Sequence, residues 1–361
     1  MTARRLERQD ALRERIEAEG LDALLVTHLP NVRYLTGFTG SAGMLVVRRD
    51  DSVLVTDFRY AVQAPQEVGN AAAVEIDAAS VWDRLRRVLG IDGIATVGIE
   101  GHALTVREAE RVSGLTRARV TPAGELVEPL RAVKAPEEVA AIRAAAELAQ
   151  EALAEVLPSI RAGRRELDVA AALEAALRRR GSEWHPFPTI VASGPRSALP
   201  HARTSAREIA QGELLLLDFG AQVDGYCADL TRTFVVGARA DERQRTVHEL
   251  VRAAQARALK HLRAGMTGRE ADALARDVIA ARGFGDAFGH SLGHGLGLEV
   301  HEAPRLSATA EAPLPLGAVV TVEPGVYLPG WGGVRLEDDV HLGPAGPELL
   351  SDGRTELIEL L

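Results

Sequence analysis

Residues 212–237 read GELLLLDFGAQVDGYCADLTRTFVVG and predict two antiparallel strands joined by a tight turn. Asp224-Gly225 is a strong signal for a two-residue hairpin turn, which sets Val223 opposite Tyr226. The same register sets Asp218 opposite Thr231 and Gly220 opposite Asp229. Because side chains alternate along a strand, Asp218 and Asp229 then share one face.

The two aspartates lie on a diagonal of roughly 7–8 Å in this hairpin, a separation that a shared metal ion can bridge. An aspartate at the end of the apolar run Leu214–Leu217 also needs a partner if it is buried. The alternative, equally weighted on the hairpin alone, makes Asp218 a turn residue and Asp229 a solvated strand residue. The single cysteine, Cys227, is interpreted as a small buried strand residue.

A second polar cluster follows in HSLGHGLGLEVHEAP (290–304), where three histidines stand among closely spaced glycines. Glycines remove side-chain bulk, so backbone and ligand can approach closely. A single histidine is rarely a ligand, but this grouping favours a binding site. The spacing is not the helical HExxH arrangement of a mononuclear zinc protease.

Two further stretches, VVTVEPGVYL (319–328) and GVRLEDDVHL (333–342), predict strands that each carry one glutamate, Glu323 and Glu337. A glutamate inside a strand needs a metal ion or a basic partner. Arg335 shares a strand face with Glu337, so an ion pair between them is a structural alternative of equal weight. Asp338 and Asp339 are expected to cap or to face solvent.

Together these segments predict one metal cage formed by Asp218, Asp229, His294, Glu323 and Glu337. Such a carboxylate-rich set favours hard divalent ions, and the surplus of carboxylates predicts two of them. We expect Mn²⁺, with Zn²⁺ and Co²⁺ as alternatives.

The composition bounds the class of protein. The chain has 361 residues, 46% of them hydrophobic and 26% charged, which predicts a folded protein of two domains. The net charge of −9 disfavours nucleic acid as a partner. No apolar run approaches the roughly 20 residues that a membrane span requires. Neither a signal peptide nor a disulfide is indicated, so a cytoplasmic location is expected.

The expected pattern of helices and strands changes near residue 130, where we place the domain boundary. The first part alternates strands at 21–27, 43–49 and 52–57 with helices at 5–19 and 80–89, and its segment 31–43 is expected to be a loop. We predict a small α/β domain over 1–130. The second part, 131–361, has helices at 136–156, 165–181, 241–263 and 268–282, each pair followed by strands. This duplicated pattern predicts an α+β domain.

The motifs HSLGHGLGLEVHE, TVEPG and RLEDD resemble those of the pita-bread metallopeptidases, in the branch of prolidase and aminopeptidase P. The segments NVRYLTGFTGS (31–41) and TDFRYAVQA (56–64) resemble the creatinase-type amino-terminal domain of that branch. The resemblance implies a pita-bread fold, in which pseudo-duplicated helix pairs pack on a curved antiparallel sheet. It also implies proline-containing peptides as substrates and a homodimer. Simple removal of an initiator methionine is disfavoured, because methionine aminopeptidases lack the amino-terminal domain.

Carried over to this sequence, the resemblance assigns Asp218 to one ion, His294 and Glu323 to the other, and Asp229 and Glu337 as bridges. It places His201, His290 and His301 in the substrate pocket and Thr231 beside a bridging carboxylate. Glu323 is expected to shuttle a proton, and His201 or His301 to stabilise the oxyanion. Candidate substrate contacts are His290, His301, Arg335 and Tyr60, with Tyr60 or Arg59 reaching a neighbouring subunit.

The function expected is cleavage of the bond before a proline, with a lean to a small aminopeptidase P over prolidase. Two distant alternatives are a creatinase-like amidinohydrolase and a non-catalytic peptide-binding module. The first would leave the five-ligand set unexplained, and the second would leave costly buried carboxylates without a metal.

Overall fold

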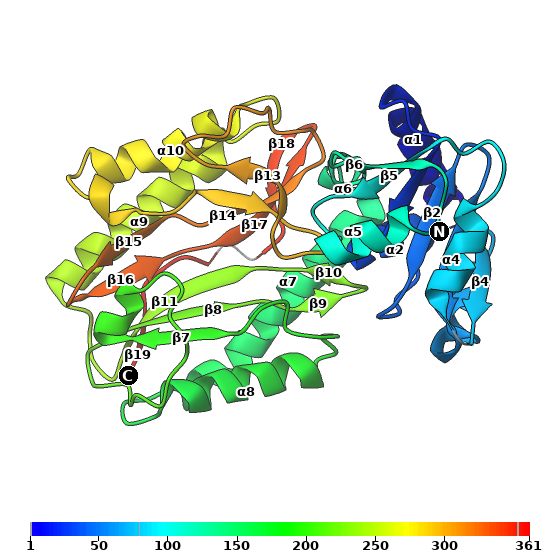
Figure 1. Ribbon diagram of the computed structural model, residues 1–361. Coiled ribbons are helices and arrows are strands. Elements are labelled where there is room, and N and C mark those ends of the chain that lie inside the picture. The colour runs from blue at the N-terminus through cyan, green and yellow to red at the C-terminus, as the bar shows by residue number, and fades with distance from the viewer. Residues whose placement is uncertain (1, 79, 352–353) are drawn as a thin grey trace. The chain divides into compact units, whose positions relative to one another are not determined.

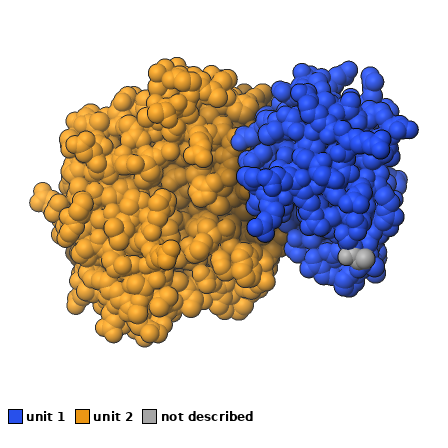
Figure 2. Space-filling view, viewed as in Figure 1, with its two compact units in different colours: residues 1–131 blue, residues 132–361 orange. Residues whose placement is uncertain are grey.

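The computed structural model describes residues 2–78, 80–351 and 354–361. It divides into two compact units, residues 1–131 and residues 132–361, which Figure 2 shows in different colours. None of the described helices combines the length and the apolar character needed to cross a bilayer. The cytoplasmic location expected from the sequence stays a prediction.

Unit 1 is built on a six-stranded mixed sheet with the order β4-β3-β2-β1-β5-β6 (Figure 1). β1 pairs antiparallel with β2 and parallel with β5, so the sheet is mixed as the α/β prediction requires. The three predicted strands are confirmed as β1 to β3. The strands are β1 (Ala23–Val26), β2 (Met44–Arg48), β3 (Ser52–Asp57), β4 (Ala73–Asp77), β5 (Thr96–Glu100) and β6 (Arg119–Ala123).

The helices of unit 1 correct one prediction: 31–43 is not all loop, because Leu29–Thr36 forms α2. Pro30 occupies the first turn, where its missing N–H costs nothing. Gly37 ends the helix at φ 79°, donating its N–H to the Arg33 carbonyl. The glycine and threonine content of this segment was therefore not enough to predict a loop. The other helices are α1 (Thr2–Ala18), η1 (Phe58–Tyr60), α3 (Gln63–Val68), α4 (Val81–Leu89), α5 (Val106–Ser113) and α6 (Glu128–Ala132).

Unit 2 begins with a helix pair and a four-stranded sheet of order β19-β11-β8-β7. The inner face of α7 is mostly alanine and valine, which lets the helix lie close against α8 and the sheet in one apolar cluster. The elements are α7 (Pro136–Val156), η2 (Leu157–Ser159), α8 (Glu166–Arg179), β7 (Ile190–Ser193), η3 (Gly194–Ala198), β8 (Leu214–Phe219), β9 (Gln222–Val223), β10 (Tyr226–Cys227), β11 (Leu230–Val236) and β19 (Ile358–Leu360).

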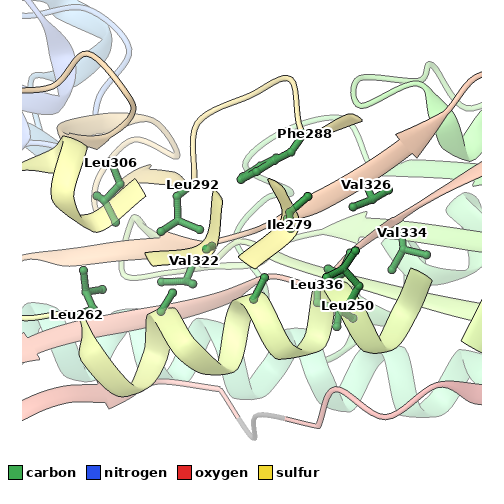
Figure 3. Close-up of a cluster of buried hydrophobic side chains, with 14 of the residues drawn as sticks. Leu250, Leu262, Ile279, Phe288, Leu292, Leu306, Val322, Val326, Val334 and Leu336 are labelled. Carbon is green, nitrogen blue, oxygen red and sulfur yellow. The ribbon is translucent and has the colours of Figure 1, made fainter. Parts of the chain in front are cut away.

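A second helix pair packs on a five-stranded sheet of order β13-β12-β14-β17-β18, so the predicted α+β duplication is confirmed. Figure 3 shows its core, where Leu250, Ile279 and Phe288 meet strand residues. The elements are α9 (Glu242–His261), α10 (Gly268–Ala280), η4 (Gly285–Ala287), β12 (Gly293–Gly295), β13 (Glu302–Leu306), β14 (Val319–Val322), β15 (Gly325–Leu328), β16 (Gly332–Arg335), β17 (Asp338–Gly343) and β18 (Gly346–Leu349).

The hairpin register is as predicted. Val223 pairs with Tyr226, and Asp218 pairs with Thr231. The turn residues Asp224 and Gly225 have φ values of 50° and 79°, as a primed turn requires. Because this register is continuous, it places the side chains of Asp218 and Asp229 on one face at the end of the sheet.

The two glutamates do not lie inside strands, contrary to the prediction. Glu323 falls between β14 and β15, and Glu337 falls between β16 and β17. At both places the chain leaves one sheet for another, because β14 pairs with β17 while β15 pairs with β16. A single bridge between Thr231 and Glu337 connects β11 to the second break.

Candidate metal centre

The structure brings the predicted metal ligands together from separate elements of unit 2. Ligand atoms of Asp229, His294 and Glu337 all lie within 4.8 Å of one another. The Nε2 atom of His294 is 3.8 Å from Asp229 Oδ2 and 3.4 Å from Glu323 Oε1. The hairpin, β12 and both strand breaks therefore converge on one point.

Asp218 is held beside this group by Arg335. The Nη2 atom of Arg335 donates to Asp218 Oδ2 at 2.5 Å, and the arginine side chain is only 3% exposed. Its Nη1 atom donates to the Tyr327 hydroxyl at 2.9 Å and to the Pro200 carbonyl at 3.1 Å. The direct ion pair of Arg335 is with Asp218 rather than with Glu337, because β16 lies beside β8, although the charge of Arg335 still opposes the raised pKa of Glu337.

Glu337 takes its hydrogen bond from a hydroxyl instead. Thr231 Oγ1 donates to Glu337 Oε2 at 2.5 Å and accepts from Arg335 Nε at 3.0 Å. The Glu337 N–H donates to the Thr231 carbonyl at 3.1 Å. Thr231 thus fixes both the backbone and the carboxylate of Glu337, which agrees with its expected place beside a bridging carboxylate.

The crowding of acids raises their pKa values. Burial first, and then Glu337 and Asp218, hold the pKa of Asp229 well above its ordinary range. Burial and then Glu323 and Asp218 do the same for Glu337. Burial raises the pKa of Glu323 to about 7 and also raises that of Asp218, although Arg335 opposes both shifts. Without a cation, these acids disfavour one another's ionised forms.

These residues fit a divalent cation. Asp218 Oδ1 and Asp229 Oδ1 are buried and accept no hydrogen bond from a described residue, so each has a lone pair to offer. Burial lowers the pKa of His294 to about 4, which keeps its imidazole in the neutral form that binds metals. Carboxylate oxygens with one imidazole suit Mn²⁺, Zn²⁺ or Co²⁺, and a divalent charge would offset the mutual repulsion.

The non-ligand histidines surround the same point. His290 Nε2 lies 2.8 Å from the Tyr327 hydroxyl, and its Nδ1 lies 3.8 Å from Glu323 Oε2. The His301 ring lies 4.2 Å from the His294 ring, centroid to centroid. His201 is exposed, and its charge acts on the pKa values of Asp218, His290 and His301.

Two predicted substrate contacts stay predictions. Arg335 is 3% exposed, and its guanidinium bonds to Asp218 and to the Tyr327 hydroxyl. Tyr60 belongs to unit 1, where its hydroxyl lies 2.7 Å from Ser41 Oγ and its ring packs on Phe38. A part for Tyr60 in substrate binding stays a prediction.

Asp338 and Asp339 correct another prediction, since both are fully buried. Asp338 pairs with Arg232 at 2.7 Å and accepts from Gln255 at 2.9 Å. Asp339 Oδ2 accepts the Asp229 N–H at 3.1 Å. Successive side chains of β17 point to opposite faces, and both acids are buried, so both faces are covered there and the two carboxylates had to find internal partners.

Comparison with known proteins identifies the family of this chain. The description of Metallopeptidase family M24 matches residues 140–344, and that of the Creatinase/Prolidase N-terminal domain matches residues 8–133. An uncharacterised peptidase of Bacillus subtilis is 43% identical over 342 residues, covering 94% of this chain and 96% of its own. The chain belongs to metallopeptidase family M24.

Two solved structures share the whole architecture. An Xaa-Pro dipeptidase from Bacillus anthracis has a TM-score of 0.95 at 39% identity, covering 98% of this chain and 99% of its own. An X-Pro aminopeptidase from Thermotoga maritima has a TM-score of 0.89 at 38% identity, covering 96% and 99%. The predicted pita-bread fold with a creatinase-like amino-terminal domain is confirmed.

Proposed function

We propose that this metallopeptidase hydrolyses the peptide bond between an amino-terminal residue and a following proline. The observation that carries the proposal is the convergence of Asp218, Asp229, His294, Glu323 and Glu337 with all five side chains intact. The names of the similar proteins, an Xaa-Pro dipeptidase and an X-Pro aminopeptidase, support the substrate class.

We propose that the five side chains hold two divalent ions, with Mn²⁺ as the working metal. Bound ions would lower the pKa of a water molecule and polarise the scissile carbonyl. Among the carboxylates, Glu323 is suited to proton transfer because its side chain is 16% exposed, against 8% for Asp229. Its carboxylate would take a proton from the attacking water and pass it to the leaving proline nitrogen.

The histidines around the cage would orient the substrate. His201 and His301 are exposed at the site and can donate a hydrogen bond to the developing oxyanion. His290, held by Tyr327, would border the proline ring. Proline has no amide hydrogen and a fixed φ, so a pocket shaped to its ring supplies specificity that a backbone donor cannot.

The position of Arg305 is an argument for activity on dipeptides rather than on longer peptides. It stands opposite His294 in the β12–β13 pair, so both side chains lie on one face of the sheet. It is exposed, and its charge lowers the pKa of His294 and His301. Among the described residues no acid pairs with it, so this guanidinium is available for the carboxylate of a substrate that ends at proline.

The second candidate is the aminopeptidase P activity toward which the sequence motifs lean. The Thermotoga maritima aminopeptidase supports it, because its identity to this chain differs by a single percentage point from that of the Bacillus anthracis dipeptidase. An aminopeptidase would accept peptides that continue past proline, and Arg305 would then be dispensable.

Hydrolysis of Ala-Pro and Ala-Pro-Ala by metal-stripped protein reloaded with Mn²⁺ separates the two. A dipeptidase cleaves only Ala-Pro, and Arg305→Met raises KM for it about tenfold or more, the range for a lost charge-assisted bond. Cleavage of Ala-Pro-Ala, unaffected by Arg305→Met, would establish the aminopeptidase. Cleavage of neither peptide would contradict the proposed function.

A homodimer is the assembly that we propose, with Tyr60 or Arg59 contributing to the neighbouring subunit's site. Both side chains lie on η1 of unit 1, Arg59 exposed and Tyr60 half-buried, and Phe58 and Val62 close by in the chain are exposed. Unchanged KM and kcat in an Arg59→Ala, Tyr60→Phe double variant would remove this role.

A further inference from the structure

One buried glutamate outside the cage holds the segment that carries His201. Glu166 opens α8, and its side chain is fully buried. Its Oε1 atom accepts the Ser193 N–H and the Ser193 hydroxyl, each at 2.9 Å. Its Oε2 atom accepts the Ser205 N–H at 3.1 Å and the Ser205 hydroxyl at 2.6 Å. One carboxylate thus ties together the two ends of residues 193–205.

The start of α8 strengthens the same attachment. The backbone N–H of Glu166 donates to the Arg207 carbonyl at 3.0 Å, and that of Leu167 donates to the Ser205 carbonyl at 3.0 Å. These amides have no partner inside the helix, so carbonyls at the end of the segment and just after it satisfy them. Arg196 adds an ion pair to Glu166 at 3.1 Å from within the segment. The cost of burying the carboxylate is offset by this set of donors.

The opposite side of the segment reaches the metal cage. Ser197 Oγ accepts the Gly333 N–H at 2.8 Å, and the Pro200 carbonyl accepts from Arg335 at 3.1 Å. Arg335 in turn holds Asp218 at 2.5 Å. His201 follows Pro200 directly, and no hydrogen bond from a described residue fixes its ring. The position of His201 therefore depends on its backbone, and the backbone depends on these anchors.

We propose that Glu166 is a positioning residue for His201: its two carboxylate oxygens clamp the ends of the 193–205 segment and so fix the distance from His201 to the cage. This inference rests on the oxyanion-stabilising role proposed for His201. Glutamine keeps the size of the side chain, but its NH₂ group would face the N–H and hydroxyl of one serine. The Glu166→Gln variant should therefore release one end of the segment.

The test is a double-mutant cycle on the Mn²⁺-loaded protein with Ala-Pro as substrate. Loss of a donor to the oxyanion predicts that His201→Ala lowers kcat about 100-fold. Glu166→Gln alone should lower kcat about tenfold with little change in KM, the cost of losing one buried partner. The pair together should be no slower than His201→Ala, because a misplaced histidine and a missing one cost the same.

A matched control keeps a structural effect apart from positioning. Glu138 lies in the first turn of α7, as Glu166 lies in that of α8; it is 4% exposed and accepts the Ala135 N–H at 2.9 Å and the Tyr226 hydroxyl at 2.6 Å. The Glu138→Gln effect should multiply with that of His201→Ala. Ser205→Ala, which deletes one hydroxyl and keeps the N–H bond, serves as a milder variant if Glu166→Gln folds poorly. It should show the same coupling to His201→Ala, and Mn²⁺ affinity should stay unchanged in both.

The outcomes separate the inference from the proposed function. Full activity in His201→Ala would overturn the role of His201 and this inference with it, while leaving the metal cage intact. A large loss in His201→Ala whose effect multiplies with those of Glu166→Gln and Ser205→Ala would overturn the positioning role alone. Reduced Mn²⁺ affinity in Glu166→Gln would make the glutamate a general structural anchor and overturn it as well.

Discussion

Thr231 connects two parts of the candidate metal centre through a single hydroxyl group. Its hydroxyl donates to Glu337 and accepts from Arg335, so one side chain orients a candidate metal ligand and the cation that holds Asp218. It is fully buried, and a lost partner there cannot be replaced by water. The family resemblance suggested this residue, which stands two places after Asp229 in the hairpin.

We predict that Thr231→Val weakens Mn²⁺ binding about tenfold or more, since a buried acceptor left without its donor costs about 1–3 kcal/mol. Valine preserves the shape, so the fold should persist. Titration calorimetry on the metal-free protein measures the affinity. Thr246→Ala, which removes a hydroxyl that donates to the Glu242 carbonyl of its own helix, is the control. Equal affinity in Thr231→Val and Thr246→Ala would refute the role.

His248 gives a prediction about pH. It is 2% exposed on α9, and burial lowers its pKa to about 4 from the ordinary 6.5. The unfolded chain therefore binds the proton more readily than the folded one, and stability falls as pH drops from 6.5 toward 4. His248→Leu should reduce that loss by about 2–3 kcal/mol at pH 4.5, at 1.36 kcal/mol per unit.

Urea unfolding of the metal-free protein between pH 7.5 and pH 4.5 measures the effect of this substitution. The acids of the cage contribute equally to the wild type and to the variant, so they cancel in the difference. Parallel stability curves for the two proteins would show that His248 does not contribute to the acid sensitivity.

Among the elements, the β8–β11 hairpin shows what a local pattern can determine. A two-residue turn with positive φ fixes the register, and alternation then fixes the faces, so the aspartate pair was predictable from residues 212–237 alone. The close approach of Gly220 to the neighbouring backbone could not be predicted from these residues. A Cβ atom there would lie 2.1 Å from the Ala228 carbonyl oxygen.

Gly220→Ala should therefore lower the free energy of unfolding by about 1–3 kcal/mol, the usual cost of overpacking. It should also weaken metal binding, because the strand that carries Asp218 must shift. Gly289→Ala is the control, since a Cβ atom at Gly289 meets no atom within 4 Å. Denaturant unfolding with equal midpoints for the two variants would contradict the account.

Other elements needed tertiary information. Glu323 and Glu337 read as strand residues because β-rich runs surround them, yet each lies where the chain changes sheets. Asp338 and Asp339 read as solvated because acids usually are, yet β17 is covered on both faces. Residues 333–342 alone do not reveal that Arg232 pairs with Asp338 or that the Asp229 N–H donates to Asp339.

In the whole molecule, the cage forms where two halves of one unit meet. Each half has a helix pair and an antiparallel sheet, and the order of five ligands along the chain was visible in the motifs. The partner of Arg335 was not visible, because Asp218 lies 117 positions away and the pairing depends on β16 lying beside β8. The family resemblance predicted the ligands, whereas the residues that hold them, such as Arg335 beside Asp218, follow from tertiary packing.

Metal removal should destabilise the whole of unit 2. A ligand that binds only the folded state stabilises it, by about 2.7 kcal/mol at a concentration 100 times its Kd. Adding Mn²⁺ to the stripped protein should therefore raise Tm in a concentration-dependent way. A Tm that does not change across the Mn²⁺ titration would mean that the clustered carboxylates do not bind this metal.

The most direct test of the central claim joins metal binding to hydrolysis in one titration. Stripped protein is titrated with Mn²⁺ while bound metal and Ala-Pro cleavage are measured together, for the wild type and for Asp229→Asn. We predict two ions per chain in the wild type, with activity appearing only as the sites fill, and loss of both binding and activity in Asp229→Asn. Full cleavage by the stripped wild type, or by Asp229→Asn without bound metal, would contradict the account.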